Sequence, residues 1–223
     1  MKRTYYSILA TAILAVMVAA CGGGGSGSGG SSGGKKSAKI TMTTEEGGKF
    51  EFYLTGSGVA TVNWGDGSEK ISRTLDNNNE WGVNFRHDYP NANIRTITIN
   101  GENITGLQIG IHHDIITSID VSRCSELTRL EINFSKLTSL NISKNTALTY
   151  LNVEANQLTS LDVSRNTALT SLSVGGQLTT AALNALFRSL HRNAGEKRIY
   201  IGGNPGERDC DRSIAESKGW TFR

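Results

Sequence analysis

Short alternations of apolar and polar residues dominate the chain, and this period of two is typical of half-buried β-strands. Turn-forming groups such as Gly65-Asp66-Gly67 stand between the alternating runs, and their glycines permit tight turns. In the first half of the chain, the alternation predicts strands at residues 39–43, 49–54, 59–64, 85–90 and 94–99. We therefore expect this part of the chain to form a small β-domain.

A different pattern follows, in which Leu-x-x-Leu-x-(Ile/Val)-x-x-x-x-Leu recurs. The first leucines of three successive units are Leu127, Leu148 and Leu169, at a spacing of 21 residues. Units of this length each form one short strand and stack in parallel, because a single unit cannot bury its apolar side alone. The positions predicted to face the shared core are Leu130, Leu151 and Leu172.

These units resemble the short bacterial leucine-rich repeat, and the resemblance covers residues 104–178. The second halves of the units, at residues 117–122, 138–143 and 159–164, are near copies of one another. The resemblance implies a solenoid with a parallel sheet on its concave side. Residues 94–104 also fit the apolar spacing, so the β-domain is expected to run directly into the solenoid through a degenerate first unit.

Residues 38–103 resemble a PKD-type immunoglobulin-like sandwich. The resemblance rests on the Trp64-Gly65-Asp66-Gly67 turn, on the His87-Asp88-Tyr89-Pro90 element and on the Thr-Ile-Thr-Ile run at residues 96–99. Asp66 could suggest a metal site, but an aspartate beside glycine commonly accepts hydrogen bonds from the backbone of its own turn. We expect Asp66, His87 and Tyr89 to be structural residues.

The last part of the chain, residues 179–223, is expected to cover the open end of the repeats. Residues 179–190 have helical spacing and a threonine start, residues 198–201 predict a strand, and a second short helix precedes the C-terminus. The expected fold is mixed β and α/β. It comprises a small PKD/Ig-like β-sandwich, a short leucine-rich-repeat solenoid and an α/β C-terminal cap.

The N-terminus has the features of an export signal: Lys2 and Arg3, then an apolar run at residues 8–20 that is too short to span a bilayer. The run ends in Val18-Ala19-Ala20-Cys21, which resembles the lipobox of bacterial lipoproteins. The resemblance implies removal of residues 1–20, lipidation of Cys21 and a Gly/Ser linker over residues 21–37. The alternative is an ordinary secretory signal with an incidental cysteine.

A lipidated Cys21 would hold the protein in the cell envelope. The C-terminal part of the chain resembles the endings of leucine-rich-repeat lipoproteins from Bacteroidetes, so we expect the outer membrane. No acidic residue follows Cys21 closely, which leaves surface or periplasmic exposure open. The formal net charge of +3 includes Lys2 and Arg3, both in the segment expected to be removed, and gives no reason to expect nucleic acid.

The chain carries no motif of a nucleophile, a phosphate loop or a paired-cysteine metal site. The most suggestive cluster, His112-His113-Asp114, places neighbouring side chains on opposite sides of an extended segment. We expect no enzymatic activity, no metal and no cofactor. His191 follows a predicted helix, where an imidazolium would interact favourably with the helix dipole.

Two further cysteines are candidates for chemistry. Cys124 occupies the position held by Asn145 and Asn166 in the other units, and is expected to be a buried ladder residue. A disulfide between Cys124 and Cys210 is the alternative in an oxidising envelope.

The outward positions of the predicted concave strands differ from unit to unit, whereas the second halves of the units are uniform. Variation that the fold does not require is a sign of a binding face, and Tyr and Arg are common anchors of interfaces. We predict that a protein partner binds these residues, as in an adhesin or an envelope scaffold. The predicted concave-face residues are Arg129, Glu131, Asn133, Tyr150, Asn152, Glu154, Ser171 and Ser173.

Two alternatives to protein binding stay open. One is a glycan-binding accessory lipoprotein of a polysaccharide-capture system, which would use exposed aromatic residues such as Trp81, Tyr150 and Tyr200. The other is a variable surface that binds nothing.

Overall fold

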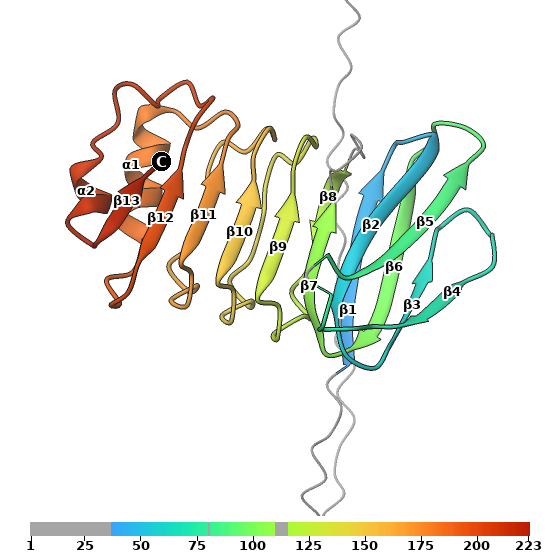
Figure 1. The fold of residues 1–223 in the computed structure, drawn as a ribbon. Helices are drawn as coiled ribbons and strands as arrows, with labels where there is room; N and C mark the ends of the chain where they lie inside the picture. The colour runs from blue at the N-terminus through green and yellow to red at the C-terminus, as the bar shows by residue number, and fades with distance from the viewer. Residues whose placement is uncertain (1–36, 80, 110–115) are drawn as a thin grey trace, which may run out of the picture. The chain divides into compact units, whose positions relative to one another are not determined.

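The computed structural model describes residues 37–79, 81–109 and 116–223, which contain thirteen β-strands and two short α-helices (Figure 1). The prediction of a β-rich chain is confirmed. The predicted signal segment, Cys21, nearly all of the linker and the His112-His113-Asp114 cluster lie outside the described residues. Within the described residues, no helix is long and apolar enough to cross a membrane.

The first eight strands build two sheets that face each other. Their bounds are β1 Ser37–Thr44, β2 Gly48–Gly56, β3 Val59–Asn63, β4 Ile71–Thr74, β5 Val83–Tyr89, β6 Arg95–Glu102, β7 Ile104–Ile109 and β8 Ile116–Asp120. Phe50, Phe52 and Leu54 alternate along β2 and are buried, as the period of two predicts. The sequence pattern missed β4, because this edge strand pairs only with β3 and buries little of its surface.

One sheet has five strands in the order β4-β3-β6-β1-β8, and the other has eight in the order β13-β12-β11-β10-β9-β7-β2-β5. The eight-stranded sheet therefore combines β2 and β5 of the N-terminal part with all the strands of the repeats. In it, β7, β9 (Arg129–Ile132), β10 (Tyr150–Val153) and β11 (Ser171–Val174) pair in parallel and lie side by side (Figure 1).

The register of the parallel strands aligns one apolar column. Leu130 pairs with Leu107 on one side and Leu151 on the other, and Leu172 pairs with Leu151. All four leucines are buried, which confirms the inward positions predicted from the 21-residue spacing. Each leucine packs against the next unit, so no unit has a core of its own.

The stack begins at a different segment from the one suggested by the sequence. Residues 95–102 form β6, which pairs antiparallel with β1 and β3 in the five-stranded sheet. The first strand of the parallel stack is β7, which follows a turn at Asn103 in the left-handed region (φ 48°). Both segments have the apolar spacing of a repeat strand, and only long-range pairing distinguishes them.

Buried asparagines link successive units. The Asn145 side-chain amide donates to the carbonyls of Val121 (2.9 Å) and Cys124 (2.8 Å), and Asn166 repeats this arrangement one unit later. Cys124 is buried in the corresponding position, as predicted, and its Sγ lies 3.6 Å from the Lys39 carbonyl oxygen. Burial raises the pKa of the Cys124 thiol to about 11.

The alternative disulfide does not form, since Cys124 and Cys210 are both free thiols. A raised pKa also makes the Cys124 thiol a poor nucleophile, which agrees with a structural role.

The C-terminal part contains α1 (Thr180–Ser189), β12 (Lys197–Tyr200), α2 (Ser213–Glu216) and β13 (Trp220–Phe222). Thr179 caps α1 by accepting a hydrogen bond from the Ala182 N–H (3.3 Å), and Leu183, Leu186 and Phe187 are buried beneath the helix. The apolar spacing of residues 179–190 predicts this helix correctly.

The C-terminal part also contains one more turn of the stack. Asn204 accepts a hydrogen bond from the Leu178 N–H (3.1 Å) and donates to the Val174 carbonyl (2.9 Å). Two units earlier, Asn156 makes the equivalent pair of bonds: it accepts from the Leu137 N–H (3.1 Å) and donates to the Ile132 carbonyl (2.7 Å). Residues 198–204 are therefore a further unit, hidden in the sequence because its spacing departs from 21 residues.

Candidate functional site: the exposed face of the eight-stranded sheet

The outward side chains of the parallel strands form two rows. Arg129, Tyr150, Ser171 and Arg198 lie opposite one another in the first row. Glu131, Asn152, Ser173 and Tyr200 form the second. We call these two rows the strand face. Six of the eight predicted binding residues belong to it, and Asn133 and Glu154 directly follow β9 and β10.

Contacts within the strand face hold its largest side chains in place. The Arg129 guanidinium carbon lies 3.9 Å from the centre of the Tyr150 ring, and the Arg129 Nη2 lies 2.9 Å from Glu131 Oε2. Asn133 donates from its side-chain amide to Glu131 Oε1 (3.1 Å). These four side chains connect β9 to β10, so a partner would meet an arrangement that is already ordered, at a reduced entropic cost.

The structure extends this surface beyond the predicted residues. Tyr53 on β2 lies opposite Gln108 on β7, and Gln108 lies opposite Glu131. Trp81, a residue that is 58% exposed, lines a small hollow with Tyr53, Gln108 and Arg129. Sequence reasoning missed Tyr53 and Gln108, because the pairing of β2 with β7 joins segments about fifty residues apart.

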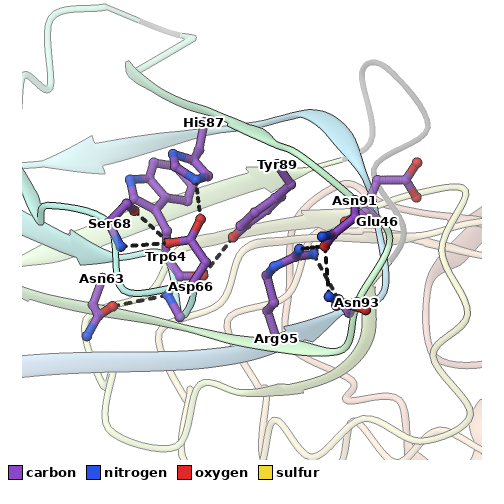
Figure 2. Close-up of polar contacts among 11 residues, drawn as sticks. Glu46, Asn63, Trp64, Asp66, Ser68, His87, Tyr89, Asn91, Asn93 and Arg95 are labelled. Atoms are coloured by element: carbon purple, nitrogen blue, oxygen red, sulfur yellow. Dashed lines mark hydrogen bonds and ion pairs between the residues drawn. The ribbon is translucent and has the colours of Figure 1, made fainter.

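The other candidate residues of the N-terminal part are Asp66, His87 and Tyr89, and they pack around Trp64 (Figure 2). His87 Nε2 donates to Asp66 Oδ2 (2.7 Å), and the His87 ring stacks on Trp64 with 5.0 Å between ring centres. The Tyr89 hydroxyl donates to the Trp64 carbonyl (2.7 Å), and burial raises the pKa of Tyr89 above its usual range.

Asp66 is also fully engaged within its own turn. It accepts hydrogen bonds from the backbone N–H (3.0 Å) and the hydroxyl (2.6 Å) of Ser68. Burial alone would raise the pKa of Asp66, but the bonds from Ser68 and His87 outweigh it and hold the pKa well below its usual range. The geometry therefore favours the structural interpretation of Asp66, His87 and Tyr89 over a ligand-binding one.

His191, just after α1, makes two hydrogen bonds through its ring nitrogens. Its Nδ1 accepts a hydrogen bond from the Asn193 N–H (3.1 Å), while its Nε2 donates to the Leu169 carbonyl (2.7 Å). His191 ties the end of α1 to the third unit.

No group of three or more histidine, cysteine, aspartate or glutamate side chains capable of holding a metal lies within the described part of the chain. The surface with the most features of a binding site in that part is the strand face and its margins.

Comparison with known proteins gives limited information. The chain matches no protein-family model and no curated protein. Among solved structures it is similar to the functional domain of InlJ from Listeria monocytogenes, a leucine-rich-repeat protein that includes a cysteine ladder. The identity is 23% and the TM-score is 0.35, over 53% of this chain and 29% of that chain. This is a weak likeness to a bacterial leucine-rich-repeat protein.

Proposed function

We propose that this chain is a bacterial lipoprotein of the cell envelope, anchored through Cys21 in the outer membrane, that binds another protein with its strand face. In this proposal, the N-terminal part is a PKD-like sandwich and the stacked units are a leucine-rich-repeat solenoid of the Bacteroidetes type. The chain would act as an adhesin or envelope scaffold, without enzymatic activity and without a nucleic-acid partner.

The observation that carries the proposal is the contrast between two sets of equivalent positions. Ser118, Ser139 and Ser160 repeat one residue type, as stacking units would require. Arg129, Tyr150 and Ser171 are equally aligned with one another, yet share no residue type. An aligned arginine and tyrosine in contact on an open sheet face is the composition of an interface anchor.

The test is made on a partner captured from the organism's natural setting. Replacing both Arg129 and Tyr150 by alanine should weaken binding by at least about 2 kcal/mol, roughly thirtyfold. Asp162→Ala, at an exposed turn outside the strand face, is the matched control and should leave binding unchanged. If the control abolished binding in a folded protein and the double variant did not, the binding face would lie elsewhere.

The membrane anchor is tested separately. Cys21→Ala should prevent partition into the detergent phase, because it removes the thiol that would carry the lipid. Mass spectrometry of the wild-type protein should show the added acyl chains. Unchanged partition of the variant, together with an unmodified Cys21 in the wild type, would contradict lipidation; protease treatment of intact cells then reports surface exposure.

A glycan is the second candidate ligand, and the exposure of Trp81 beside Tyr53 favours it. Aromatic faces stack on the apolar faces of sugar rings. Binding on a glycan array that is lost in Trp81→Ala, with no protein captured, would favour this alternative.

A further inference from the structure

At the carboxyl ends of the parallel strands, an open hollow of about 460 Å³ lies beside the strand face. Phe134, two residues after β9, and Tyr200, at the end of β12, both line it, and these residues are 55% and 39% exposed. The carboxylate-bearing Glu154, directly after β10, lines it too. The hollow therefore combines two exposed aromatic rings with one half-buried acidic side chain.

The inner surface of the hollow is kept open by glycines. A Cβ at Gly175 would lie 2.9 Å from the Gly202 carbonyl oxygen, and one at Gly202 would lie 2.2 Å from the Tyr200 hydroxyl. Side chains at these two positions would collide with backbone or displace the Tyr200 ring. The space beside Tyr200 thus depends on residues that contribute no side chain of their own.

Phe134 occupies a backbone conformation that is unfavourable for it. Its φ is 53°, in the left-handed region, and Ala155 takes almost the same value (52°) at the equivalent position of the next unit. Gly203, at the equivalent position of the unit that contains β12, also has a positive φ (77°), whereas Gly176 in the third unit does not, so stacking does not impose this conformation on every unit. A bulky residue there is an outlier whose strain suggests a function for the exposed ring.

Glu154 differs from the other carboxylates on this side of the sheet. Glu51 pairs with Lys49 (2.7 Å), Glu131 with Arg129 (2.9 Å) and Glu196 with Arg198 (3.1 Å). Among the residues that the structure describes, no lysine, arginine or histidine forms an ion pair with Glu154. A second carboxylate, that of Glu207, is near the rim, where it accepts a hydrogen bond from the Gly203 N–H (3.0 Å).

We propose that this hollow binds the side chain of a lysine or arginine that a protein partner presents. The ammonium or guanidinium group would pair with Glu154, and the faces of Phe134 and Tyr200 would attract the same cation through their ring quadrupoles. This inference rests on the proposed function, since the hollow adjoins the strand face and would add a charge-selective anchor to it. A partner would then need a basic residue beside the surface that meets Arg129 and Tyr150.

The direct test uses a small probe, N-acetyl-lysine methylamide, titrated into the isotope-labelled full chain in detergent and followed by NMR. The amide signals of Gly175, Gly176, Gly202 and Gly203 should shift in a saturable way. The neutral N-acetyl-norleucine methylamide, which has no ammonium group, should leave those signals in place. Higher salt should weaken the binding, because it screens a partly exposed charge pair.

Variants then identify the groups responsible. Glu154→Gln should weaken probe binding at least about fivefold, and Tyr200→Ala and Phe134→Gly should each weaken it by a similar factor. Glu196→Gln is the matched control, because its carboxylate already pairs with Arg198 and does not line the hollow. It should change the dissociation constant by less than about twofold.

Three results of the probe titration would overturn the inference. The first is that the lysine probe does not shift the glycine signals. The second is that Glu154→Gln binds the probe as tightly as the wild-type protein. The third is that a neutral disaccharide shifts the same signals in a saturable way and that Glu154→Gln does not change its dissociation constant. If a captured partner needs Arg129 and Tyr150 but tolerates Glu154→Gln, the inference fails while the proposed function stands. If the probe binds as expected and no partner depends on Arg129 and Tyr150, the hollow is a cation site and the proposed function fails.

Discussion

Asp66 shows how a residue that suggests chemistry in the sequence can be explained by local hydrogen bonding. Its carboxylate accepts bonds from Ser68 and His87, and the side chains of Asp66 and His87 are each 16% exposed. The resulting low pKa means that Asp66 stays ionised in the folded protein at pH values where it would be protonated in the unfolded chain.

The stability of the protein should therefore depend on pH through Asp66. A depressed carboxyl pKa contributes stability that is present above the ordinary value of about 4 and is lost as the pH falls toward the folded-state pKa. Asp66→Asn should lower the free energy of unfolding at pH 7 by about 1–3 kcal/mol. It should also flatten the decline in stability between about pH 5 and pH 2, and parallel denaturation curves for the two proteins would contradict this role.

Ala155 provides a second test at the residue scale. Its φ of 52° is costly for any residue with a Cβ, so Ala155→Gly should raise the free energy of unfolding by up to about 1 kcal/mol. Chemical denaturation measures the change. Gly195 already has a positive φ, so Gly195→Ala is the converse substitution and should destabilise the protein. A destabilised Ala155→Gly would show that the positive φ of Ala155 is not the dominant cost at this position.

At the scale of the element, each short strand depends on its neighbours. β10 has only four residues and pairs on both sides, with β9 and β11, so its stability comes from the units that flank it. Its inward Leu151 is fully buried between the leucines of those units.

Leu151→Ala should lower the free energy of unfolding by about 2–5 kcal/mol, because it removes buried apolar surface and leaves a cavity shared by three units. Ser160→Ala, at an exposed position of the second half of the unit, should cost much less. Equilibrium denaturation compares the two, and a neutral Leu151→Ala would mean that the inward positions are assigned wrongly.

At the scale of the whole described unit, the eight-stranded sheet crosses the predicted boundary between residues 103 and 104. β2 of the N-terminal part pairs with β7, and β7 pairs with β9 of the repeats. The two parts share one sheet, and residues 35–223 group into one compact unit. The sequence-based boundaries remain predictions, but the shared sheet links the folding of the two parts.

Leu54→Ala should accordingly destabilise both parts together. Leu54 is buried on β2 and pairs with Leu107, so its truncation should cost about 2–5 kcal/mol. Hydrogen exchange should show the same loss of protection free energy at amides of β6 and of β11. A loss confined to β6, with β11 unchanged, would show that the two parts unfold independently.

Local patterns in the sequence were sufficient for much of the fold. The 21-residue spacing identified the inward leucines, the period of two identified most strands, and Thr179 marked the start of α1. These features depend on residues close together in the chain, where apolar periodicity and capping act directly. The prediction that Cys124 is buried followed from the same comparison of repeat positions.

Features that depend on distant pairing came only from the tertiary structure. Residues 94–99 and 104–109 have the same apolar spacing, and their strands join different sheets because β1 and β3 pair with one and β2 with the other. The extension of the strand face to Tyr53, and the meeting of Phe134, Glu154 and Tyr200 around one hollow, have the same origin. Periodicity specifies which side of a strand is buried, whereas the choice of neighbouring strand depends on the packing of the whole sheet.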